Sequence, residues 1–516
     1  MMITNNHSLP MLLAGMLADP SVLADILVQG ISLDSRDVEA GSVFLSLAKD
    51  VEQRTNNLKQ ALAADISIVL YDAELELTEQ EHSLLIEAKV AAYAIKKLAN
   101  KAGEIAARFY GHPSMALDII AVTGTNGKTS VSQFIAQGLE SLGHACGVIG
   151  TLGSGRITDL NYTGMTTPDP VTLQKTLAGF CKQGINYAVI EASSHALEQG
   201  RLNSIAIDVA VLTNLSRDHL DYHGDMAGYS AAKSELFDFP SVKAAVLNSA
   251  DSLGQELITK LAERDNVTTL TYNSVENGSS TLSAEHIQMT AEGIEFVLNS
   301  VFGSETVTSE LVGRFNIDNL LAAVASLIAI GMTFEQAILA INTCQAVDGR
   351  MQSYGGKQQA HIVIDFAHTP DALTQALTSL QAHVPANGDL WCVFGCGGDR
   401  DTGKRAVMGK AAEQYADKVV ITDDNPRSED SALIVKDILS GITYPETVLV
   451  EHDRKIAITY AVTHAKASDI ILIAGKGHER YQDIHGVKYD FSDSQVVLDV
   501  LRAANDASLD SIGDRA

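Results

Sequence analysis

Short runs of apolar and β-branched residues alternate with longer amphipathic stretches along almost the whole chain. Runs of this kind between helical patterns are typical of parallel strands that are buried on both faces, so they predict an α/β fold. The predicted strands cover residues 65–72, 117–124, 186–193, 208–215, 243–248, 361–368, 389–398, 417–425 and 468–477.

Two changes in this pattern divide the 516 residues into three predicted domains. One lies near residue 90, before a stretch that we expect to be helical, and the other lies near residue 345, before a new strand. We expect a small N-terminal α/β domain (1–89), a central P-loop-type ATPase domain with a mostly parallel sheet (90–345) and a Rossmann-like C-terminal domain (346–516). The first twenty residues lack a basic segment before their apolar patch, which predicts a short helix rather than a signal peptide.

Composition narrows the classes of partner. The formal net charge is −27, and nucleic-acid binding needs a basic face, so we expect no nucleic-acid partner. The chain has no uncharged apolar run of the roughly 18 residues that span a membrane, so no membrane association is expected. The five cysteines form no C-x-x-C pair, which favours a reducing cytoplasm over a disulfide framework or a zinc site. We expect a monomer with small-molecule substrates, whose anionic groups must be bound by local donors.

The clearest chemical pattern lies at residues 119–143, where a strand passes through a Gly-rich turn into an amphipathic helix. Such a turn directs backbone N–H groups and a helix N-terminus at phosphate oxygens. Lys128 is predicted to reach the outer phosphates and Thr129 to ligate magnesium. Val122 stands where the strict motif has glycine, so the loop is a compact version of that motif. A glycine-rich turn with an incidental lysine is the alternative.

Acidic and histidine side chains follow two later strands. Glu191 ends a predicted strand, where a carboxylate can hold a metal ion that bridges phosphates. Residues 213–237 then carry a dense polar cluster. For this cluster a metal or phosphate role and a solvated loop with a capped helix are equally supported. Its members are Asp218, His219, Asp221, His223 and Asp225.

The stretch "DDNPRSED" (423–430) places Arg427 directly after Pro426 and among carboxylates. Read alone, this stretch favours a turn, because Asn-Pro initiates turns and Asp and Ser cap helices. A stiffly held guanidinium is also suited to bidentate binding of a carboxylate.

Taken together, these motifs resemble the Mur ligases, ATP-dependent amide-forming enzymes of peptidoglycan synthesis. The matching stretches stand in the family's order between about residue 30 and about residue 495. They are "TGTNGKTS", "EASSHAL", "TNLSRDHLDYHG", "AAKSELF", "GRFNIDNLLAA", "DGRM", "DFAHTPDAL", "FGCGGDRDTGKR", "DDNPRSE" and "AGKGHE". The resemblance implies addition of meso-2,6-diaminopimelate to UDP-N-acetylmuramoyl-L-alanyl-D-glutamate through an acyl phosphate. L-lysine as substrate, a folylpolyglutamate-type ligase and a nucleotide switch without ligase chemistry are the alternatives.

The resemblance assigns residues to the ATP and metal sites. Asn319 is expected against the adenine, and Arg350 and Asp365 are expected to reach phosphate and ribose. Lys233 matches a lysine that the family converts with carbon dioxide to a carbamate, although an unmodified lysine paired with a helix glutamate would leave the same pattern. The implied ATP-binding residues are Gly124, Thr125, Asn126, Gly127, Lys128, Thr129, Ser130, Asn319, Arg350 and Asp365. The implied magnesium ligands are Thr129, Glu191, His219 and the carbamate of Lys233, and the implied catalytic residues are Lys128, Glu191, His219 and Lys233.

For the UDP-muropeptide, the resemblance points to a uridine contact at Ser35 and to sugar–peptide contacts in the central domain. The implied residues are Leu33, Ser35, Thr166, Thr167, Ser193, Gln199 and Arg201. Two departures fall on this side of the site. The family's Asp-Gly-Arg is replaced by "VEQRTNN" at residues 51–57, and Met165 stands where close relatives carry asparagine.

The amino-acid substrate is expected in the third domain. Arg427 is predicted to bind the carboxylate at the far end of diaminopimelate, which lysine lacks. The ammonium at the same end of diaminopimelate is predicted to be bound by Asp424, Asn425 and Glu479. The implied residues are Arg400, Asp424, Asn425, Pro426, Arg427, Gly475 and Glu479. Other notable side chains have packing as their simplest explanation, namely Trp391, Cys392, Cys396 and His478.

Overall fold

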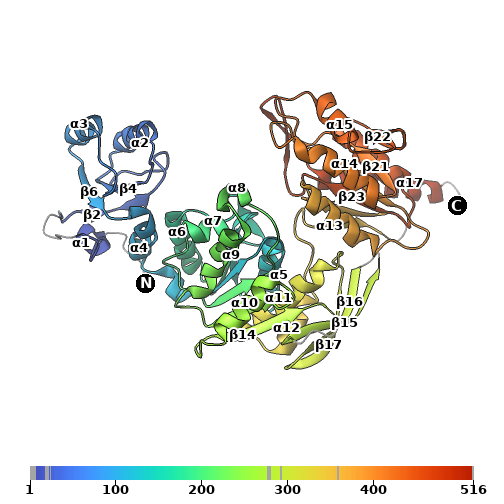
Figure 1. Ribbon diagram of the computed structural model, residues 1–516, viewed down its shortest axis with the longest axis horizontal. Coiled ribbons are helices and arrows are strands. Elements are labelled where there is room, and N and C mark those ends of the chain that lie inside the picture. Colours follow the sequence, from blue (N-terminus) through green and yellow to red (C-terminus); the bar gives the residue numbers. More distant parts are fainter. Residues whose placement is uncertain are drawn as a thin grey trace. The chain divides into compact units, whose positions relative to one another are not determined.

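The computed structural model describes residues 7–17, 23, 25–275, 280–290, 293–356 and 359–513, except for the side chains of Asp221 and of residues 505–513. The chain forms two compact units, drawn in Figure 1. One comprises Met1–Asn273 with Ala322–Ala340, and the other comprises Ser274–Leu321 with Ile341–Ala516. Among the described residues, no helix combines the length and apolar character needed to cross a membrane.

In its described part, the first unit contains a four-stranded sheet, a larger sheet, a short antiparallel pair of β1 and β2, and the helices that cover them. Of the opening segment that was expected to be helical, α1 covers four residues, and residues 1–6 and 18–20 lie outside the described part. In chain order its elements are β1 (His7–Ser8), α1 (Leu9–Leu12), β2 (Leu27–Val28), β3 (Gly30–Ser32), β4 (Ser42–Ser46), α2 (Val51–Ala63), β5 (Ile68–Asp72), α3 (Glu79–Ala88), β6 (Ala91–Ile95), α4 (Leu98–Tyr110), η2 (Pro113–Ala116), β7 (Asp118–Thr123), α5 (Lys128–Ser141), β8 (Cys146–Gly150), β9 (Gly153–Arg156), β10 (Asp159–Asn161), α6 (Pro170–Lys182), β11 (Tyr187–Glu191), α7 (Ser194–Glu198), β12 (Val209–Leu212), α8 (Leu220–His223), α9 (Met226–Ser234), η3 (Glu235–Asp238), β13 (Ala244–Asn248), α10 (Ser252–Leu261) and β14 (Thr268–Asn273). Helices α11 (Phe315–Ala329) and α12 (Phe334–Ile341) span the division between the units.

The smaller sheet has the parallel order β3-β4-β5-β6. Successive side chains of β4 point to opposite faces of this sheet. Val43 and Leu45 pack in the core that includes α4, and Phe44 packs in the core that includes α2 and α3. Strand β6 pairs with β5, so the boundary predicted after residue 89 falls inside this sheet. The expected helix begins only at Leu98, because Lys89 ends α3 in a left-handed conformation (φ 57°) and the apolar run that follows has a strand to pair with.

The part of the larger sheet that belongs to this unit has the order β10-β9-β8-β11-β7-β12-β13-β14. The strands from β8 to β14 are parallel, and β9 and β10 extend the sheet as an antiparallel ribbon. Helices α6, α7 and α10 contribute to the core on one face. Strand β7 lies between β11 and β12, so the loops that follow these three strands meet at one edge.

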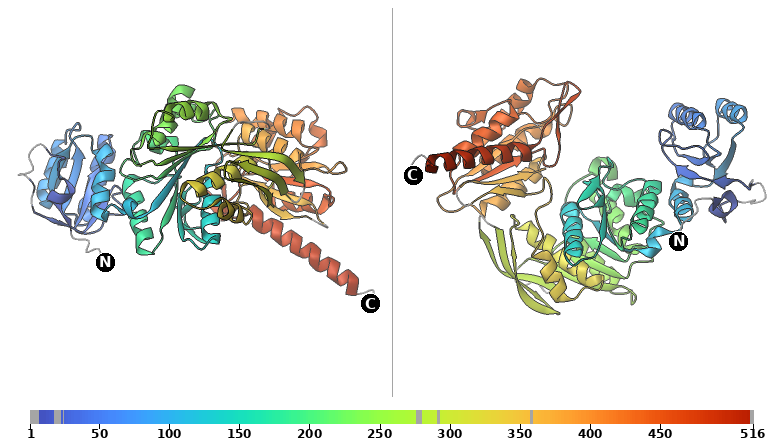
Figure 2. Two further views of the ribbon diagram at one scale, coloured as in Figure 1. Left: turned by 90° about the horizontal axis from the view of Figure 1, so that it is seen from below. Right: turned by 180° about the vertical axis from the view of Figure 1, so that it is seen from behind.

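The second unit is built on a sheet of order β18-β19-β23-β20-β21-β22, in which only β18 is antiparallel. Helices α13, α14 and α15 cover one face, and α16 and α17 cover the other (Figure 1; Figure 2, right). Its elements are β15 (Leu282–Thr290), β16 (Gly293–Ser300), β17 (Gly303–Ser309), β18 (Gln352–Gly355), β19 (His361–Asp365), α13 (Pro370–Gln381), β20 (Leu390–Phe394), α14 (Gly403–Tyr415), β21 (Lys418–Ile421), α15 (Ser431–Leu439), η4 (Pro445–Thr447), β22 (Leu449–Val450), α16 (Arg454–His464), β23 (Ile470–Ala474), β24 (Tyr481–Ile484), β25 (Val487–Asp490) and α17 (Asp493–Gly513).

All nine strands predicted from the apolar runs are present, and the strands β7, β11, β12 and β13 on one sheet and β19, β20, β21 and β23 on the other are parallel. The predicted α/β fold class is therefore confirmed.

A buried ion pair joins the first residues of α16 and α17. The Arg454 guanidinium donates from Nε to Asp493 Oδ1 at 2.7 Å and from Nη2 to Asp493 Oδ2 at 2.8 Å, and neither side chain is exposed. Nη2 also donates to the carbonyl of Ala474 at 3.0 Å, at the end of the central strand β23. The pair therefore fastens both helices to the sheet.

We expect Arg454→Met to lower the free energy of unfolding of the C-terminal domain by about 3–5 kcal/mol, because it leaves the Asp493 carboxylate buried without a partner. Trp391 is the only tryptophan of the chain and lies in this domain, so its fluorescence during urea denaturation reports this transition alone. Arg480→Met is the matched control, because the Arg480 side chain is 85 % exposed and its Nη2 lies 3.9 Å from the carboxylate of Asp348. An unchanged midpoint for Arg454→Met would contradict the stabilising role of the pair.

Candidate active site

The glycine-rich loop leaves the carboxyl end of β7 and enters α5. A Cβ added to Gly124 (φ 146°) would lie 1.8 Å from Thr213 Oγ1, so only glycine fits against the end of β12. The Asn126 N–H donates to Asn214 Oδ1 at 3.0 Å. Gly127, also with positive φ (83°), occupies the N-cap position of α5. The end of the neighbouring strand therefore shapes the loop at the N-terminus of α5, and a helix N-terminus favours phosphate binding.

Two lysines donate to the same backbone oxygen in this loop. Lys128 Nζ lies 2.8 Å from the Gly124 oxygen and 2.9 Å from the Thr125 oxygen, and Lys233 Nζ lies 2.7 Å from the Gly124 oxygen. Lys233 is 1 % exposed and stands 4.4 Å from the centre of the Tyr229 ring. Burial, reinforced by the nearby charge of Lys128, lowers the pKa of Lys233 to about 6. The Lys233 amine is therefore mostly neutral at pH 7.

The Glu191 carboxylate ends β11 and is 1 % exposed. Oε2 accepts hydrogen bonds from Thr129 Oγ1 at 3.0 Å and from Thr151 Oγ1 at 2.9 Å, and Oε1 accepts one from the Thr151 N–H at 3.0 Å. A Cβ on Gly150 would lie 2.1 Å from Oε1, so a glycine is needed to admit the carboxylate. Thr166 Oγ1 lies 3.1 Å from Thr151 Oγ1. Among the described residues Glu191 has uncharged donors and no ion pair, which fits a carboxylate reserved for a divalent cation.

The side chains of the polar cluster in residues 213–237 differ in exposure and in the contacts that they make. Asp218 and His219 are about half exposed, with His219 Nε2 3.4 Å from Asp218 Oδ2. His223 is buried, with Nδ1 3.1 Å from a carboxylate of α7, and Asp225 caps α9. Asp221 has no described side chain. In the described part of the chain, no group of three or more His, Cys, Asp or Glu side chains could hold a metal.

The central residues predicted to contact the sugar–peptide substrate form one connected group. The Thr167 hydroxyl lies 3.1 Å from Ser193 Oγ. Arg201 Nη1 donates to the Thr167 carbonyl at 2.6 Å, and Nη2 donates to Gln199 Oε1 at 2.6 Å. Met165 Sδ lies 3.7 Å from Arg201 Nη1. The residue that departs from the family pattern thus contacts the arginine of this group.

In the N-terminal domain, Ser35 Oγ donates to Gln60 Oε1 at 2.8 Å, and Leu33 is partly buried. The stretch that replaces the family's Asp-Gly-Arg forms the first turns of α2. Its arginine, Arg54, points into the domain and pairs with Glu81 at 2.8 Å, with 3 % and 0 % of the two side chains exposed. This arginine is therefore a structural residue here.

The residues expected at the nucleotide base and ribose lie in the second unit. Asn319 Nδ2 donates to Asn316 Oδ1 at 2.9 Å, so its amide is held on α11. The Arg350 guanidinium carbon lies 4.9 Å from the centre of the Phe366 ring. Asp365 ends β19, and its burial raises the pKa of its carboxyl. Their roles toward ATP stay predictions.

Arg427 is held by a hairpin that the motif analysis did not include. Its backbone is left-handed (φ 51°), which is unfavourable for a residue with a side chain. The Arg427 N–H donates to the Asp483 oxygen at 2.9 Å, and the His485 N–H donates to the Arg427 oxygen at 2.7 Å, both from the β24–β25 hairpin. Arg427 Nη1 donates to the Gly398 oxygen at 2.6 Å. The turn and the recognition hypotheses are therefore compatible, because the turn fixes the guanidinium.

The structure brings several of the other predicted diaminopimelate residues to the same place. A Cβ on Gly397 would lie 2.9 Å from Arg427 Nη1 and 3.9 Å from Arg400 Cγ, so both arginines border this glycine. A Cβ on Gly475 would lie 3.8 Å from the carboxyl carbon of Asp424. These residues follow β20, β21 and β23, which are neighbouring parallel strands.

Lys476 is the functional candidate that the sequence analysis missed. Its side chain is fully buried, and Nζ lies 3.0 Å from Asn425 Oδ1, 3.2 Å from Glu479 Oε2 and 3.5 Å from Asp424 Oδ1. The three residues predicted to receive a substrate ammonium therefore already surround an ammonium of the protein. The sequence feature that could have indicated Lys476 is its position directly after a buried strand, because a charged residue buried there needs a partner of opposite charge.

The packing explanations are supported for several side chains. Trp391 is 8 % exposed and donates from Nε1 to Asp469 Oδ2 at 3.1 Å. Cys392 and Cys396 are buried, and burial raises the pKa of both thiols. All five cysteines are free. The His478 and Phe366 ring centres lie 5.2 Å apart with their planes tilted by 37°, and burial lowers the pKa of the His478 imidazole.

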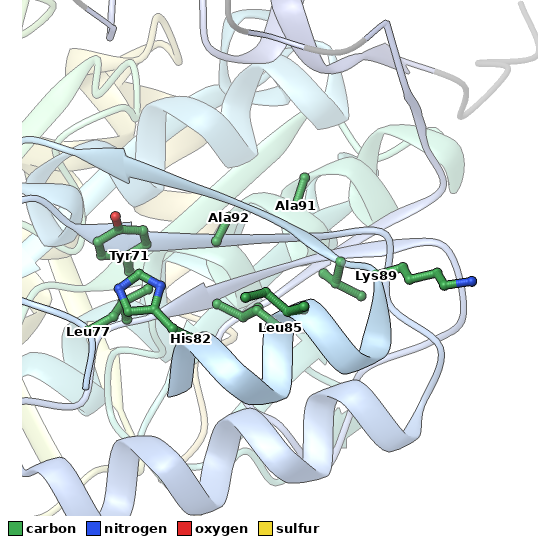
Figure 3. A pocket seen from close by; sticks show the side chains of 9 residues that line it. Tyr71, Leu77, His82, Leu85, Lys89, Ala91 and Ala92 are labelled. Carbon is green, nitrogen blue, oxygen red and sulfur yellow. The ribbon is translucent and has the colours of Figure 1, made fainter. Parts of the chain in front are cut away.

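A hollow of about 430 Å³ in the N-terminal domain contains none of the predicted site residues. Figure 3 shows it between α3 and the β5–β6 edge of the small sheet. It is lined by Tyr71, Leu77, His82, Leu85, Ile86, Lys89, Val90, Ala91 and Ala92.

Comparison with known proteins agrees with this arrangement. The chain is 43 % identical over 473 residues to a UDP-N-acetylmuramoyl-L-alanyl-D-glutamate–2,6-diaminopimelate ligase of Pseudomonas putida, with 91 % of this chain and 94 % of the relative covered. It is 43 % identical over 474 residues to the ligase of the same name of Coxiella burnetii, with 92 % and 95 % covered. A solved structure of a ligase of this name superposes with a TM-score of 0.72 at 37 % identity, covering 97 % of this chain and 99 % of that one.

More distant structures share the fold alone. A folylpolyglutamate synthase of Mycobacterium tuberculosis superposes with a TM-score of 0.58 at 20 % identity and covers 73 % of this chain and 92 % of its own. The Mur ligase middle domain matches residues 122–327, and the Mur ligase glutamate ligase domain matches residues 349–477. The chain belongs to the Mur ligase family.

Proposed function

We propose that this chain joins meso-2,6-diaminopimelate to the D-glutamyl side-chain carboxylate of UDP-N-acetylmuramoyl-L-alanyl-D-glutamate, with ATP converted to ADP and phosphate. The observation that supports the proposal is the contact of Asn425, two residues before Arg427, with Glu479, together with the phosphate loop and its two lysines. The relatives of Pseudomonas putida and Coxiella burnetii, which cover 91 % and 92 % of the chain, bear the name of this ligase. The reaction belongs to the cytoplasmic synthesis of peptidoglycan precursors.

The phosphate loop binds and activates ATP. In the proposed reaction, the D-glutamyl carboxylate attacks the γ-phosphorus in line, a P–O bond to ADP breaks, and an acyl phosphate forms. The neutral amine of diaminopimelate then attacks the acyl carbon, inorganic phosphate leaves with the C–O electron pair, and the proton lost from the nitrogen leaves with the phosphate. Lys128 stabilises the charge on the transferring group, for which its ammonium exchanges the Gly124 and Thr125 carbonyls for phosphate oxygens.

Magnesium fits the residues at the end of β11. Glu191 and the Thr129 hydroxyl would hold it, with His219 entering from the neighbouring loop. Bound there, the ion neutralises charge on the phosphates. The buried Glu191 carboxylate orients Thr129 through their 3.0 Å hydrogen bond and so prepares both ligands at once.

Lys233 supplies a further anion if its neutral amine takes up carbon dioxide. The nitrogen forms a bond to the carbon of carbon dioxide and loses a proton, which gives a carbamate. The low pKa of Lys233, about 6, supports this proposal because only the neutral amine reacts.

Selection between diaminopimelate and lysine depends on the far end of the incoming amino acid. Diaminopimelate carries a carboxylate and an ammonium there, whereas lysine carries only an ammonium. Arg427 is fixed for bidentate binding of the carboxylate, and a guanidinium left without its partner disfavours lysine.

The function is tested by mixing the protein with ATP, magnesium and the UDP-muropeptide, and measuring phosphate release with diaminopimelate or lysine. We expect release with diaminopimelate and a tripeptide product by mass. Equal release with lysine would overturn the assigned specificity, and release with folate and glutamate instead would favour a folylpolyglutamate-type ligase.

Lys128→Ala should lower kcat/KM at least about 100-fold, because one of the principal donors to the transferring phosphoryl group is lost. Circular dichroism should show an unchanged fold. Lys182→Ala, at an exposed position on α6, should retain full activity. Near-normal turnover by Lys128→Ala would refute the role of the loop.

Arg427→Lys should raise the KM for diaminopimelate about tenfold or more, since an ammonium cannot replace the two parallel hydrogen bonds of a guanidinium. The KM values for ATP and UDP-muropeptide should not change. Arg480→Lys provides an exposed arginine in the same domain as control. An unaltered KM for diaminopimelate in the Arg427 variant would show that another residue binds the carboxylate.

The carbamate should depend on pH in a defined direction. Above a pH of about 6 the Lys233 amine is neutral and can react, and below it the amine is protonated and the carbamate is lost. With ¹³C-bicarbonate, the protein should give a carbamate carbon signal at pH 8 that disappears below pH 6. Lys233→Ala should lack the signal, and Lys243→Ala, whose side chain is 77 % exposed, should keep it. A signal that persists in Lys233→Ala would contradict the assignment.

A further inference from the structure

The amino-acid subsite contains a buried cation of its own. Lys476 follows β23 directly, and its side chain has no exposure to solvent. Lys476 Nζ donates hydrogen bonds to Asn425 and Glu479 and lies within ion-pair distance of Asp424. A lysine at such depth is costly unless paired, and here two carboxylates and an amide oxygen surround it.

Lys476 is the centre of a network that orients the subsite. Asn425 Nδ2 donates to Glu479 Oε2 at 2.9 Å, so the same carboxylate oxygen is held by both Asn425 and Lys476. Asn425 Oδ1 also accepts from the Asp483 N–H at 2.9 Å, which connects the network to the hairpin behind Arg427. Removing Lys476 would release Glu479 Oε2 from its only charged partner among the described residues.

The charged side chains of this network carry a net charge of −1. Asp424 and Glu479 contribute two negative charges and Lys476 one positive charge, so the cluster is left with one negative charge. The nearby Arg454 is neutralised by Asp493. Glu479 is 23 % exposed in its side chain, and within the described part of the chain its Oε1 accepts no hydrogen bond. One substrate ammonium bound at Glu479 Oε1 would bring the net charge of the network to zero.

We propose that Lys476 is a positioning residue for the incoming amino acid. It does not touch the substrate. It holds Glu479 and Asn425 in place and reduces the charge of the subsite to the value that a single substrate ammonium neutralises. This inference rests on the proposed function, because the ligand whose far ammonium is received is the amino-acid substrate of that reaction.

The kinetic test is Lys476→Met, which keeps the length of the side chain and removes its charge. Two carboxylates would then share a buried site, and either a carboxyl takes up a proton or Glu479 turns to solvent. Both outcomes remove the acceptor for the substrate ammonium. We expect the KM for diaminopimelate to rise at least tenfold, with the KM for ATP and the kcat at saturating diaminopimelate within threefold of wild type.

The matched control is Lys488→Met. Lys488 and Lys476 both lie over the Tyr481 ring, at 4.2 and 5.8 Å from its centre, but Lys488 is exposed and has no ion pair among the described residues. Its substitution should change none of the three KM values. A purely structural role for Lys476 would instead lower the active fraction, so kcat would fall with every KM unchanged, and that result would overturn the proposal.

A second variant keeps the test decisive if Lys476→Met does not fold. The double variant Lys476→Met/Asp424→Asn restores the net charge of −1, with Glu479 as the single ion and Asn425 still donating to it. We expect its KM for diaminopimelate to lie below that of Lys476→Met, or, if the single variant is unfolded, the double variant to fold and to turn over diaminopimelate. A double variant that is further impaired, or that also fails to fold, would contradict the charge-balance argument.

Different results would contradict the proposed ligase reaction and the positioning role of Lys476. If the wild-type protein makes no tripeptide with diaminopimelate, the proposed function is wrong. If wild type is active and Lys476→Met has a normal KM for diaminopimelate, only the role of Lys476 is wrong.

Discussion

Parallel strands end at the same edge of a sheet, and every part of the proposed chemistry depends on this constraint. In the larger sheet of the first unit, β7 lies between β11 and β12, so the glycine-rich loop, Glu191 and Asn214 meet although they are up to 90 residues apart in the chain. In the C-terminal sheet the same rule gathers the residues after β20, β21 and β23. Each site is therefore built from short loops on a rigid support.

Buried charge is the second theme of these sites. The chain carries a net charge of −27 and acts on anionic substrates, so local arrangement must overcome the general repulsion. Lys128 and Lys233 converge on one carbonyl oxygen, and burial, reinforced by the charge of Lys128, lowers the pKa of the Lys233 amine to about 6. In the C-terminal domain, acidic groups surround Lys476 instead. Burial thus weakens the positive charge of Lys233, whereas the carboxylates of Asp424 and Glu479 stabilise that of Lys476.

The parallel strands could be predicted from the sequence because burial on both faces leaves continuous apolar runs, as in β7 and β23. The hairpin strands β15 to β17 and β24 to β25 were missed, since their exposed faces interrupt such runs with polar residues. Local motifs indicated Lys128, Glu191 and Arg427. They could not indicate that Arg54 turns inward to Glu81, or that Lys476 fills the acidic cluster, because these pairings depend on contacts between distant segments.

The proposed reaction activates the D-glutamyl carboxylate as an acyl phosphate, and oxygen labelling follows that carboxylate oxygen into the products. The UDP-muropeptide is prepared with ¹⁸O in the D-glutamyl side-chain carboxylate and turned over with ATP, magnesium and diaminopimelate. We expect a tripeptide product and inorganic phosphate that carries one ¹⁸O for each amide bond formed, with none in ADP. Unlabelled phosphate alongside tripeptide would contradict the acyl phosphate, and the absence of tripeptide would contradict the ligase itself.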